Sequence, residues 1–411
     1  TLRSVDYNAF GDYSISMSAV KAPTPISGDN TDELFIGTDE AEVFDTGGGN
    51  DTVHSGKGDD RVLLGQGDDY AISGGGREYF SGGGGHDRIS YFNSPTGVNI
   101  NLATSEVSRS WAVNDGISGF DSADGSNTGN DVIWGNGFEN TIRTHGGNDK
   151  VYAGKGDDHV FLGDGDDYVL AGGGQEEFHG GDGNDFISYY KNKNGVFVNL
   201  ATNEVSGSWA ENDSISGFEN VSGSQSGHDE IHGTVGANVI KTYRGDDTVH
   251  SGDGDDKVYA GLGRDQVFLG DCNDYVLAGD GPGEFHGGSG ADYICYYRSR
   301  SGVSVNLETT EVSGSWAEGD TISGFENVSG SETGNDTIYG SSDANLIKTY
   351  GGNDHIHAGG GNDTVYAGDG NDQVFSVTVM TTWSWAAAEV KTSTGALEMT
   401  SSATAKVMPV S

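Results

Sequence analysis

The chain has few of the residues that stabilise most proteins of its length. Only 33% of its 411 residues are hydrophobic, which argues against a large conventional core. No run of about 18 apolar residues occurs, so we expect no segment that spans a bilayer. Cys272 and Cys295 are the only cysteines, too few for a disulfide scaffold. We interpret them as incidental substitutions rather than as a bridge.

Basic residues are also scarce. Lys and Arg total 21 against 63 Asp and Glu, for a net charge of −42. Because nucleic acids and anionic membranes are bound by basic surfaces, this charge excludes both as partners. A compact fold with so many carboxylates needs counter-ions, and the natural partner is a divalent cation.

Glycine and aspartate are abundant, and they recur in a nine-residue frame. The frame has the form G-G-x-G-x-D-x-U-x, where U is a large apolar residue. It is clearest in THGGNDKVY, AGKGDDHVF, LGDGDDYVL, AGGGQEEFH and GGDGNDFIS, which follow one another over residues 144–188. The frame divides the chain into four blocks at 28–90, 126–188, 224–295 and 331–375, separated by three similar inserts at 91–125, 189–223 and 296–330.

The inserts share short motifs with one another. Each contains a GV-x-V/I-N-L segment, a Trp-Ala pair and an ISGF segment. In the second insert, Val196, Val198 and Leu200 alternate with period two, which predicts a strand. The aromatic residues, such as Trp209 and Phe218, either form a plug that closes one roll and joins it to the next, or expose a site for a sugar or a partner.

The spacing of the frame predicts calcium binding. Its glycines allow a tight turn with positive φ, and the U residue and its neighbours form a short strand. With two nonapeptides per coil, we expect two stacked parallel sheets, with alternate turns along opposite edges and pairs such as Val160 and Val169 inside. Turn carbonyls and the Asp at the sixth position supply the oxygen ligands that Ca²⁺ prefers.

The predicted ligands are the sixth-position aspartates and the glycines of the most regular turns. The aspartates are Asp51, Asp60, Asp69, Asp87, Asp131, Asp149, Asp158, Asp167, Asp185, Asp229, Asp247, Asp256, Asp265, Asp274, Asp292, Asp336, Asp354, Asp363 and Asp372. The glycines are Gly47, Gly49, Gly56, Gly58, Gly65, Gly67, Gly154, Gly156, Gly163, Gly165, Gly252, Gly254, Gly261, Gly263, Gly359, Gly361, Gly368 and Gly370. Weak or empty sites are expected where the sixth residue is Glu78, Glu176, Gly283, Asn140, Asn238 or Asn345.

Over residues 28–375 the nonapeptides closely resemble the RTX, or hemolysin-type calcium-binding, repeat family. More than twenty copies in one frame make the match specific. The resemblance implies an all-β fold, a parallel β-roll, export by a type I system, and calcium sites that fill outside the cell. An acidic, Gly-rich chain should fold only when cations bind, and roughly 20 Ca²⁺ would offset its charge.

Other site chemistries fit the sequence poorly. Aspartates that recur every nine residues differ from the one asymmetric carboxylate pair of a glycosidase. His228 and His232 lie across a turn and a strand, so they do not share a face as zinc ligands on a helix do. The chain has no G-x-S-x-G and no P-loop, and we expect no catalytic activity.

Both ends depart from the frame. The chain begins at Thr1 without an initiator Met or a leader, which suggests processing or a longer parent protein. Within residues 1–27, the first 22 weakly resemble the end of a bacterial pre-peptidase C-terminal domain, and KAPTP indicates a linker. Residues 376–411 are interpreted as a cap, as a C-terminal export signal, or as the repeat continued in a shifted reading frame.

The sequence therefore predicts a secreted or cell-surface bacterial protein that folds on calcium. As a structural module it would serve as a spacer, an adhesin or a unit of a surface layer or filament, with self-assembly or an extracellular polysaccharide as the partner. The alternative is an accessory or secretion region of a larger secreted enzyme, a peptidase or a polysaccharide-modifying one.

Overall fold

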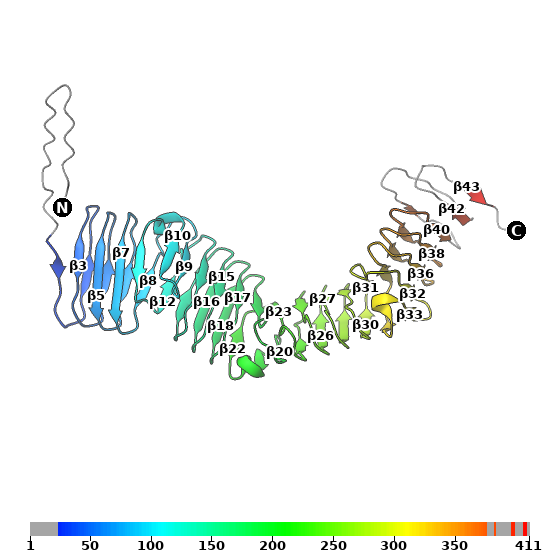
Figure 1. Ribbon diagram of the computed structural model, residues 1–411, viewed down its shortest axis with the longest axis horizontal. Coiled ribbons are helices and arrows are strands. Elements are labelled where there is room, and N and C mark those ends of the chain that lie inside the picture. The colour runs from blue at the N-terminus through cyan, green and yellow to red at the C-terminus, as the bar shows by residue number, and fades with distance from the viewer. Residues whose placement is uncertain (1–23, 376–381, 384–395, 399–405, 409–411) are drawn as a thin grey trace, which may run out of the picture.

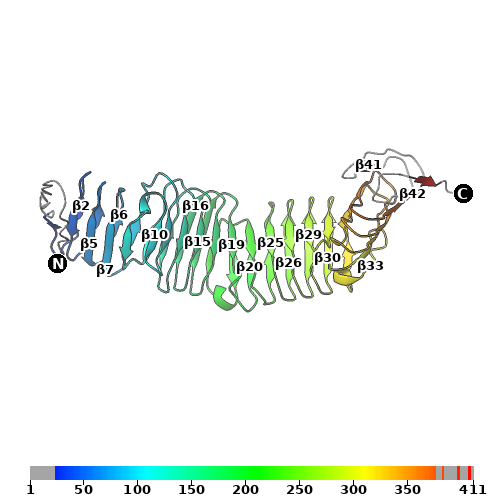
Figure 2. The same cartoon turned by 45° about the horizontal axis from the view of Figure 1, so that its top comes forward.

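A computed structural model describes residues 24–375, 382–383, 396–398 and 406–408. These residues form one elongated, bent β-solenoid whose strands stack along its length (Figure 1; Figure 2). None of the helices among them has the length and apolar character needed to cross a membrane. The interpretations of residues 1–22, and most of those of 376–411, fall outside the described residues.

Five sheets make up the roll, named A to E in chain order. Sheet A has β1 (Ile26–Ser27), β3 (Val43–Asp45), β5 (Arg61–Gln66), β7 (Tyr79–Gly84) and β11 (Gly116–Ser118). Sheet B has β2 (Leu34–Ile36), β4 (Thr52–His54), β6 (Tyr70–Ile72), β8 (Arg88–Ser90), β12 (Ser122–Asp124), β14 (Thr141–Arg143), β16 (His159–Asp164), β18 (Glu177–Asp182) and β22 (Ser214–Ser216).

Sheet C is the longest, and sheets D and E face it in turn. Sheet C has β10 (Glu106–Ser108), β9 (Asn99–Asn101), β13 (Val132–Trp134), β15 (Lys150–Tyr152), β17 (Tyr168–Leu170), β19 (Phe186–Ser188), β23 (Asn220–Ser222), β25 (Val239–Lys241), β27 (Lys257–Tyr259), β29 (Tyr275–Leu277), β31 (Tyr293–Cys295), β35 (Asn327–Ser329), β37 (Leu346–Lys348), β39 (Thr364–Tyr366) and β41 (Thr382–Trp383). Sheet D has β21 (Glu204–Ser206), β20 (Phe197–Asn199), β24 (Glu230–His232), β26 (Thr248–Asp253), β28 (Gln266–Asp271), β30 (Glu284–Ser289) and β34 (Thr321–Ser323). Sheet E has β33 (Val312–Ser313), β32 (Ser304–Asn306), β36 (Thr337–Tyr339), β38 (His355–His357), β40 (Gln373–Phe375), β42 (Ala396–Glu398) and β43 (Lys406–Met408).

The strand register follows the two-nonapeptide coil. Val160 pairs with Phe178 in sheet B, and Val151 pairs with Val169 in sheet C, each 18 residues further on and in parallel. These central strand residues are fully buried, so the core is a thin double row of U residues between two sheets. The predicted parallel β-roll is confirmed.

Each insert replaces one sheet while the opposite sheet continues. In the first insert, β11 ends sheet A beside β7, and the antiparallel hairpin β9–β10 begins sheet C. Meanwhile β12 pairs with both β8 and β14, so sheet B runs through without a break. The second and third inserts repeat this around sheet C. The roll therefore has no open ends at the inserts, unlike the separate rolls expected from the sequence.

The insert aromatics play two different roles. Phe120, Phe218 and Phe325 are buried, as a plug requires. Each Trp lies in a short 3₁₀ turn, η1 (Ser110–Ala112), η2 (Ser208–Ala210) or η3 (Ser315–Ala317), and Trp209 is 44% exposed. The Phe residues therefore pack into the core, which continues through the inserts, whereas Trp209 lies at the surface.

Candidate calcium sites in the turns

A buried carboxylate precedes most strands of the roll. Asp158 lies directly before β16 and is fully buried. Its Oδ1 accepts the backbone N–H of Asn140, one coil earlier, at 2.9 Å. Its Oδ2 is buried and has no hydrogen-bond partner among the described residues. An ionised oxygen in this position is costly unless a proton or a cation offsets its charge.

The aspartates form rows along the edges of the roll. Before sheet C, the backbone N–H of Asp149 donates to Asp167 Oδ1 at 2.7 Å, and that of Asp167 donates to Asp185 Oδ1 at 2.9 Å. Asp158 belongs to the other row, which precedes sheet B. The predicted alternation of edges is therefore confirmed.

All 19 aspartates named from the sequence are buried, and 15 of them have an unpartnered Oδ2. Those 15 are Asp51, Asp60, Asp69, Asp87, Asp149, Asp158, Asp167, Asp185, Asp247, Asp256, Asp274, Asp292, Asp354, Asp363 and Asp372. Because buried polar atoms are normally paired, an unpaired carboxylate oxygen that recurs from turn to turn fits the role of a cation ligand.

The turn glycines have the conformation expected for them. Every glycine predicted as a ligand has positive φ, with +109° at Gly163 and +134° at Gly165. A Cβ on Gly163 would lie 1.8 Å from the carbonyl oxygen of His145, and one on Gly165 would lie 1.8 Å from that of Gly147. The coils therefore stack with backbone carbonyls directly against the glycines of the next coil, where no side chain fits.

The oxygens of the turns fit calcium better than zinc. Among the described residues, no three His, Cys, Asp or Glu side chains gather into a metal site. Most turns offer one carboxylate together with backbone carbonyls, which is an all-oxygen set of the kind that calcium takes. Zinc prefers nitrogen and sulfur from side chains.

Burial strongly changes the acidity of the row aspartates. It raises the pKa of Asp158 to about 7. It raises the pKa of Asp167 to about 7 as well, with repulsion from Asp149 adding to the effect. Burial raises the pKa of Asp265 to about 8. Without a cation these carboxyls retain protons near neutral pH, so calcium competes with protons for them.

A family model for the RTX calcium-binding nonapeptide repeat matches residues 36–71, 125–160, 152–187, 225–258, 250–283, 331–354 and 339–374. The chain belongs to the RTX calcium-binding repeat family. Its cofactor is calcium, bound in multiple copies.

Among solved structures, the RTX roll is similar to a hyperactive, Ca²⁺-dependent, β-helical antifreeze protein from an Antarctic bacterium. The two share 15% identity over 85% of each chain, with a TM-score of 0.25. No curated protein matches the RTX chain.

Three RTX turns without a sixth-position Asp recruit a carboxylate from the following insert. The backbone N–H groups of Glu78, Glu176 and Gly283 donate to Asp115 at 2.8 Å, Asp213 at 2.9 Å and Asp320 at 2.7 Å. Burial and the charge of Asp213 raise the pKa of Glu176 to about 9, so this side chain stays protonated at neutral pH. These insert aspartates lie outside the nonapeptide frame and were not predicted from it, although each follows its insert Trp by four positions.

Two other groups of RTX turns satisfy their sixth residue without a cation. Asn140 Oδ1 accepts the N–H of Asn136 at 2.8 Å, and its Nδ2 donates to the Asp121 carbonyl at 2.7 Å; Asn238 and Asn345 are held in the same way. The second group is Asp131, Asp229 and Asp336, whose carboxylates accept backbone N–H groups at both oxygens. We therefore expect these three to be the weakest of the predicted ligands.

The remaining candidate metal and disulfide residues lie apart from the RTX rows. His228 is exposed in a turn, and His232 at the end of β24 contacts Glu230 at 3.1 Å. Cys272 is exposed and Cys295 is buried, and both are free thiols.

Proposed function

We propose that this RTX protein is a secreted structural module without catalytic activity of its own, which folds when calcium binds outside the cell. The observation that carries the proposal is the repeated, buried, unpartnered Oδ2 of the turn aspartates. Since these carboxylates oppose a metal-free fold, the free energy of calcium binding becomes free energy of folding. Folding would then follow export through a type I system.

The proposed role is that of a spacer or of a building block in a surface layer, filament or adhesin. An elongated roll supports this role, because one sheet runs through each insert and joins successive blocks into a single extended body (Figure 1). The competing proposal is an accessory or secretion region of a larger enzyme, in which the same roll would carry a catalytic domain.

Calcium-dependent assembly tests the structural role. The purified chain in millimolar calcium is expected to form ordered assemblies, measured by light scattering and electron microscopy, that dissolve when a chelator is added. A folded chain that stays monomeric over a wide concentration range would contradict the assembly role. A catalytic domain encoded upstream of Thr1 would favour the accessory role.

A further inference from the structure

In each of the last three blocks, the third nonapeptide has a left-handed residue other than glycine at its second position. At the second position of one nonapeptide, where most turns have glycine, the chain has His145, Tyr243 and Tyr350, with φ of +71°, +68° and +61°. A left-handed conformation is unfavourable for a residue that carries a Cβ. Strain maintained at three equivalent points indicates a function for the rings that it positions.

Each of these rings belongs to a small cluster at the start of its block, called here a ring–cation cluster. A second ring from the preceding insert packs edge-on against the first: Phe92 on His145 at 4.8 Å between centroids, Tyr190 on Tyr243 at 4.7 Å, and Tyr297 on Tyr350 at 4.6 Å. Two residues before the strained ring lies a cation over aromatic faces: Arg143, Lys241 or Lys348. Lys241 Nζ lies 4.9 Å from the Phe186 centroid and 5.8 Å from that of Tyr259.

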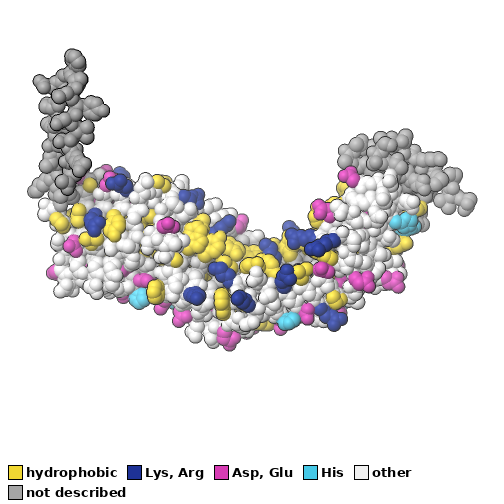
Figure 3. All heavy atoms as spheres, viewed as in Figure 1, with side chains coloured by type: hydrophobic (Ala, Val, Ile, Leu, Met, Phe, Trp, Pro, Cys, Tyr) yellow, Lys and Arg dark blue, Asp and Glu magenta, His cyan; other side chains and the backbone are white. Residues whose placement is uncertain are grey.

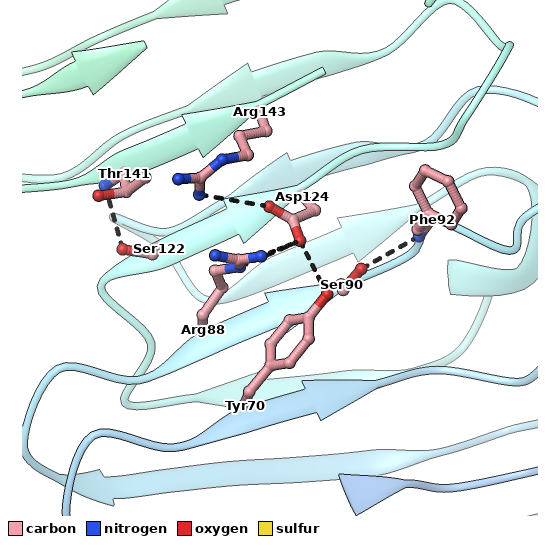
Figure 4. Close-up of polar contacts among 8 residues, drawn as sticks. All are labelled: Tyr70, Arg88, Ser90, Phe92, Ser122, Asp124, Thr141 and Arg143. Atoms are coloured by element: carbon pink, nitrogen blue, oxygen red, sulfur yellow. Dashed lines mark hydrogen bonds and ion pairs between the residues drawn. The ribbon is translucent and has the colours of Figure 1, made fainter. Parts of the chain in front are cut away.

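The first cluster contains its own anion. The buried carboxylate of Asp124 forms ion pairs with Arg88 at 2.9 Å and Arg143 at 4.0 Å (Figure 4). It also accepts a hydrogen bond from the Tyr70 hydroxyl at 3.0 Å. A carboxylate from the chain itself therefore lies between the two arginines of the first cluster.

The other two clusters lack this carboxylate. Ser222 and Ser329 stand where the first cluster has Asp124. Within the part of the chain that the structure describes, neither Lys241 nor Lys348 forms an ion pair. By comparison with the first cluster, each lysine lacks a carboxylate partner among the described residues.

The surroundings favour the middle cluster over the last one. An open hollow of about 780 Å³ adjoins it, lined by Lys241, Arg244 and Arg298, by the rings of Tyr190, Tyr259 and Trp316, and by no Asp or Glu. The corresponding hollow at Lys348, of about 1000 Å³, includes Glu332 and Asp369. Hydrophobic side chains and Lys and Arg side chains gather over the middle of the concave side of the molecule (Figure 3). The three cations lie beside partly exposed rings, in a chain whose net charge is −42.

We propose that the hollow around Lys241 binds an acidic saccharide, with its carboxylate at the three cations and a sugar ring on the tyrosine and tryptophan faces. The first cluster supports a carboxylate as the bound group, since Asp124 occupies that place there. Ring faces suit the C–H surface of a sugar, whereas the strong negative charge of the whole chain opposes a densely charged nucleic acid. This proposal rests on the proposed function, because the hollow exists only when the roll has folded.

Calorimetric titration of the full chain in calcium tests this site. The probe is a hyaluronan hexasaccharide, which alternates glucuronate and N-acetylglucosamine, and chitohexaose is the uncharged counterpart. Lys241→Met retains the apolar stem and removes the charge. Tyr243→Gly restores the usual turn residue and relieves strain, so it should preserve folding. Tyr350→Gly is the matched control in the last cluster.

We expect measurable binding of the hyaluronan hexasaccharide, at least tenfold weaker binding by Lys241→Met and Tyr243→Gly, and an unchanged affinity for Tyr350→Gly. Ser222→Asp, which recreates the first cluster, should also weaken binding at least tenfold. Equal binding of chitohexaose, equal binding of decaglutamate or of a DNA oligonucleotide, or an equal effect of Tyr350→Gly would overturn the inference. If circular dichroism shows that the chain is folded and it still binds no hyaluronan hexasaccharide, this inference is wrong but the proposed function stands. A chain that does not fold in calcium would instead refute the proposed function, and this inference with it.

Discussion

Replacing Asp167 with Asn should have opposite effects with and without calcium. Asp167 lies in the row between Asp149 and Asp185, where its Oδ1 accepts a backbone N–H and its Oδ2 has no partner. Asn keeps the acceptor oxygen and removes the charge. In calcium, the loss of one site held at 100 times its Kd costs about 2.7 kcal/mol, so Asp167→Asn should lower the melting temperature.

Without calcium the same change should favour folding. Burial raises the pKa of Asp167 from 3.8 to about 7, which corresponds to about 4 kcal/mol before solvent screening and about half of that after it. A raised carboxyl pKa weakens the fold above the unfolded-state pKa, and the cost is complete once the pH exceeds the folded-state value. At pH 8 in chelator, Asp167→Asn should therefore have at least as much β-structure as the parent chain.

The assay is circular dichroism during heating at pH 8, in millimolar calcium and in chelator. Asp166→Asn is the control, because Asp166 is the exposed neighbour and loses the same charge. Equal destabilisation of Asp167→Asn in both solutions, or identical behaviour of the two variants, would refute the assignment of Asp167 as a calcium ligand.

Three further outcomes follow from the same geometry. In chelator, the chain should gain β-structure as the pH falls from 8 to 4, because the row aspartates become protonated; circular dichroism that is flat over this range would contradict their raised pKa values. Gly163→Ala should cost at least about 2 kcal/mol in calcium, since φ is +109° and the new Cβ would meet the His145 carbonyl, whereas Lys155→Ala in an exposed turn position should melt like the parent chain. Asp320→Ala should cost about 2–3 kcal/mol, because it leaves the buried Tyr296 hydroxyl without its acceptor at 2.9 Å; a denaturant midpoint equal to that of the parent would show that the pair is dispensable.

The regular part of the fold could be predicted because its period is strict. A spacing of nine residues sends consecutive turns to opposite edges, so the rows of Asp149 and Asp158 and the positive φ of the turn glycines follow from the frame alone. The chemistry of the carboxylates follows as well, because burial at a turn leaves one oxygen per side chain without a partner.

The inserts could not be predicted in the same way. Their strands pair at separations unrelated to nine, such as Tyr79 with Gly116 and Asn99 with Val132. Periodicity therefore gave no register for them, and the replacement of one sheet beside an unbroken opposite sheet was not foreseen. For the same reason Asp115 was missed, since it serves the turn at Glu78 from outside the frame.

The central claim is that calcium binding and folding are one event. A calcium titration at pH 8 that records circular dichroism and bound calcium together tests it most directly. We expect a disordered chain in chelator that becomes β-rich cooperatively. It should bind about as many ions as there are sixth-position turn aspartates with an unpartnered Oδ2, which number 15 in the described residues. A chain that is already β-rich in chelator at pH 8, or that binds calcium without a change in its spectrum, would contradict this account.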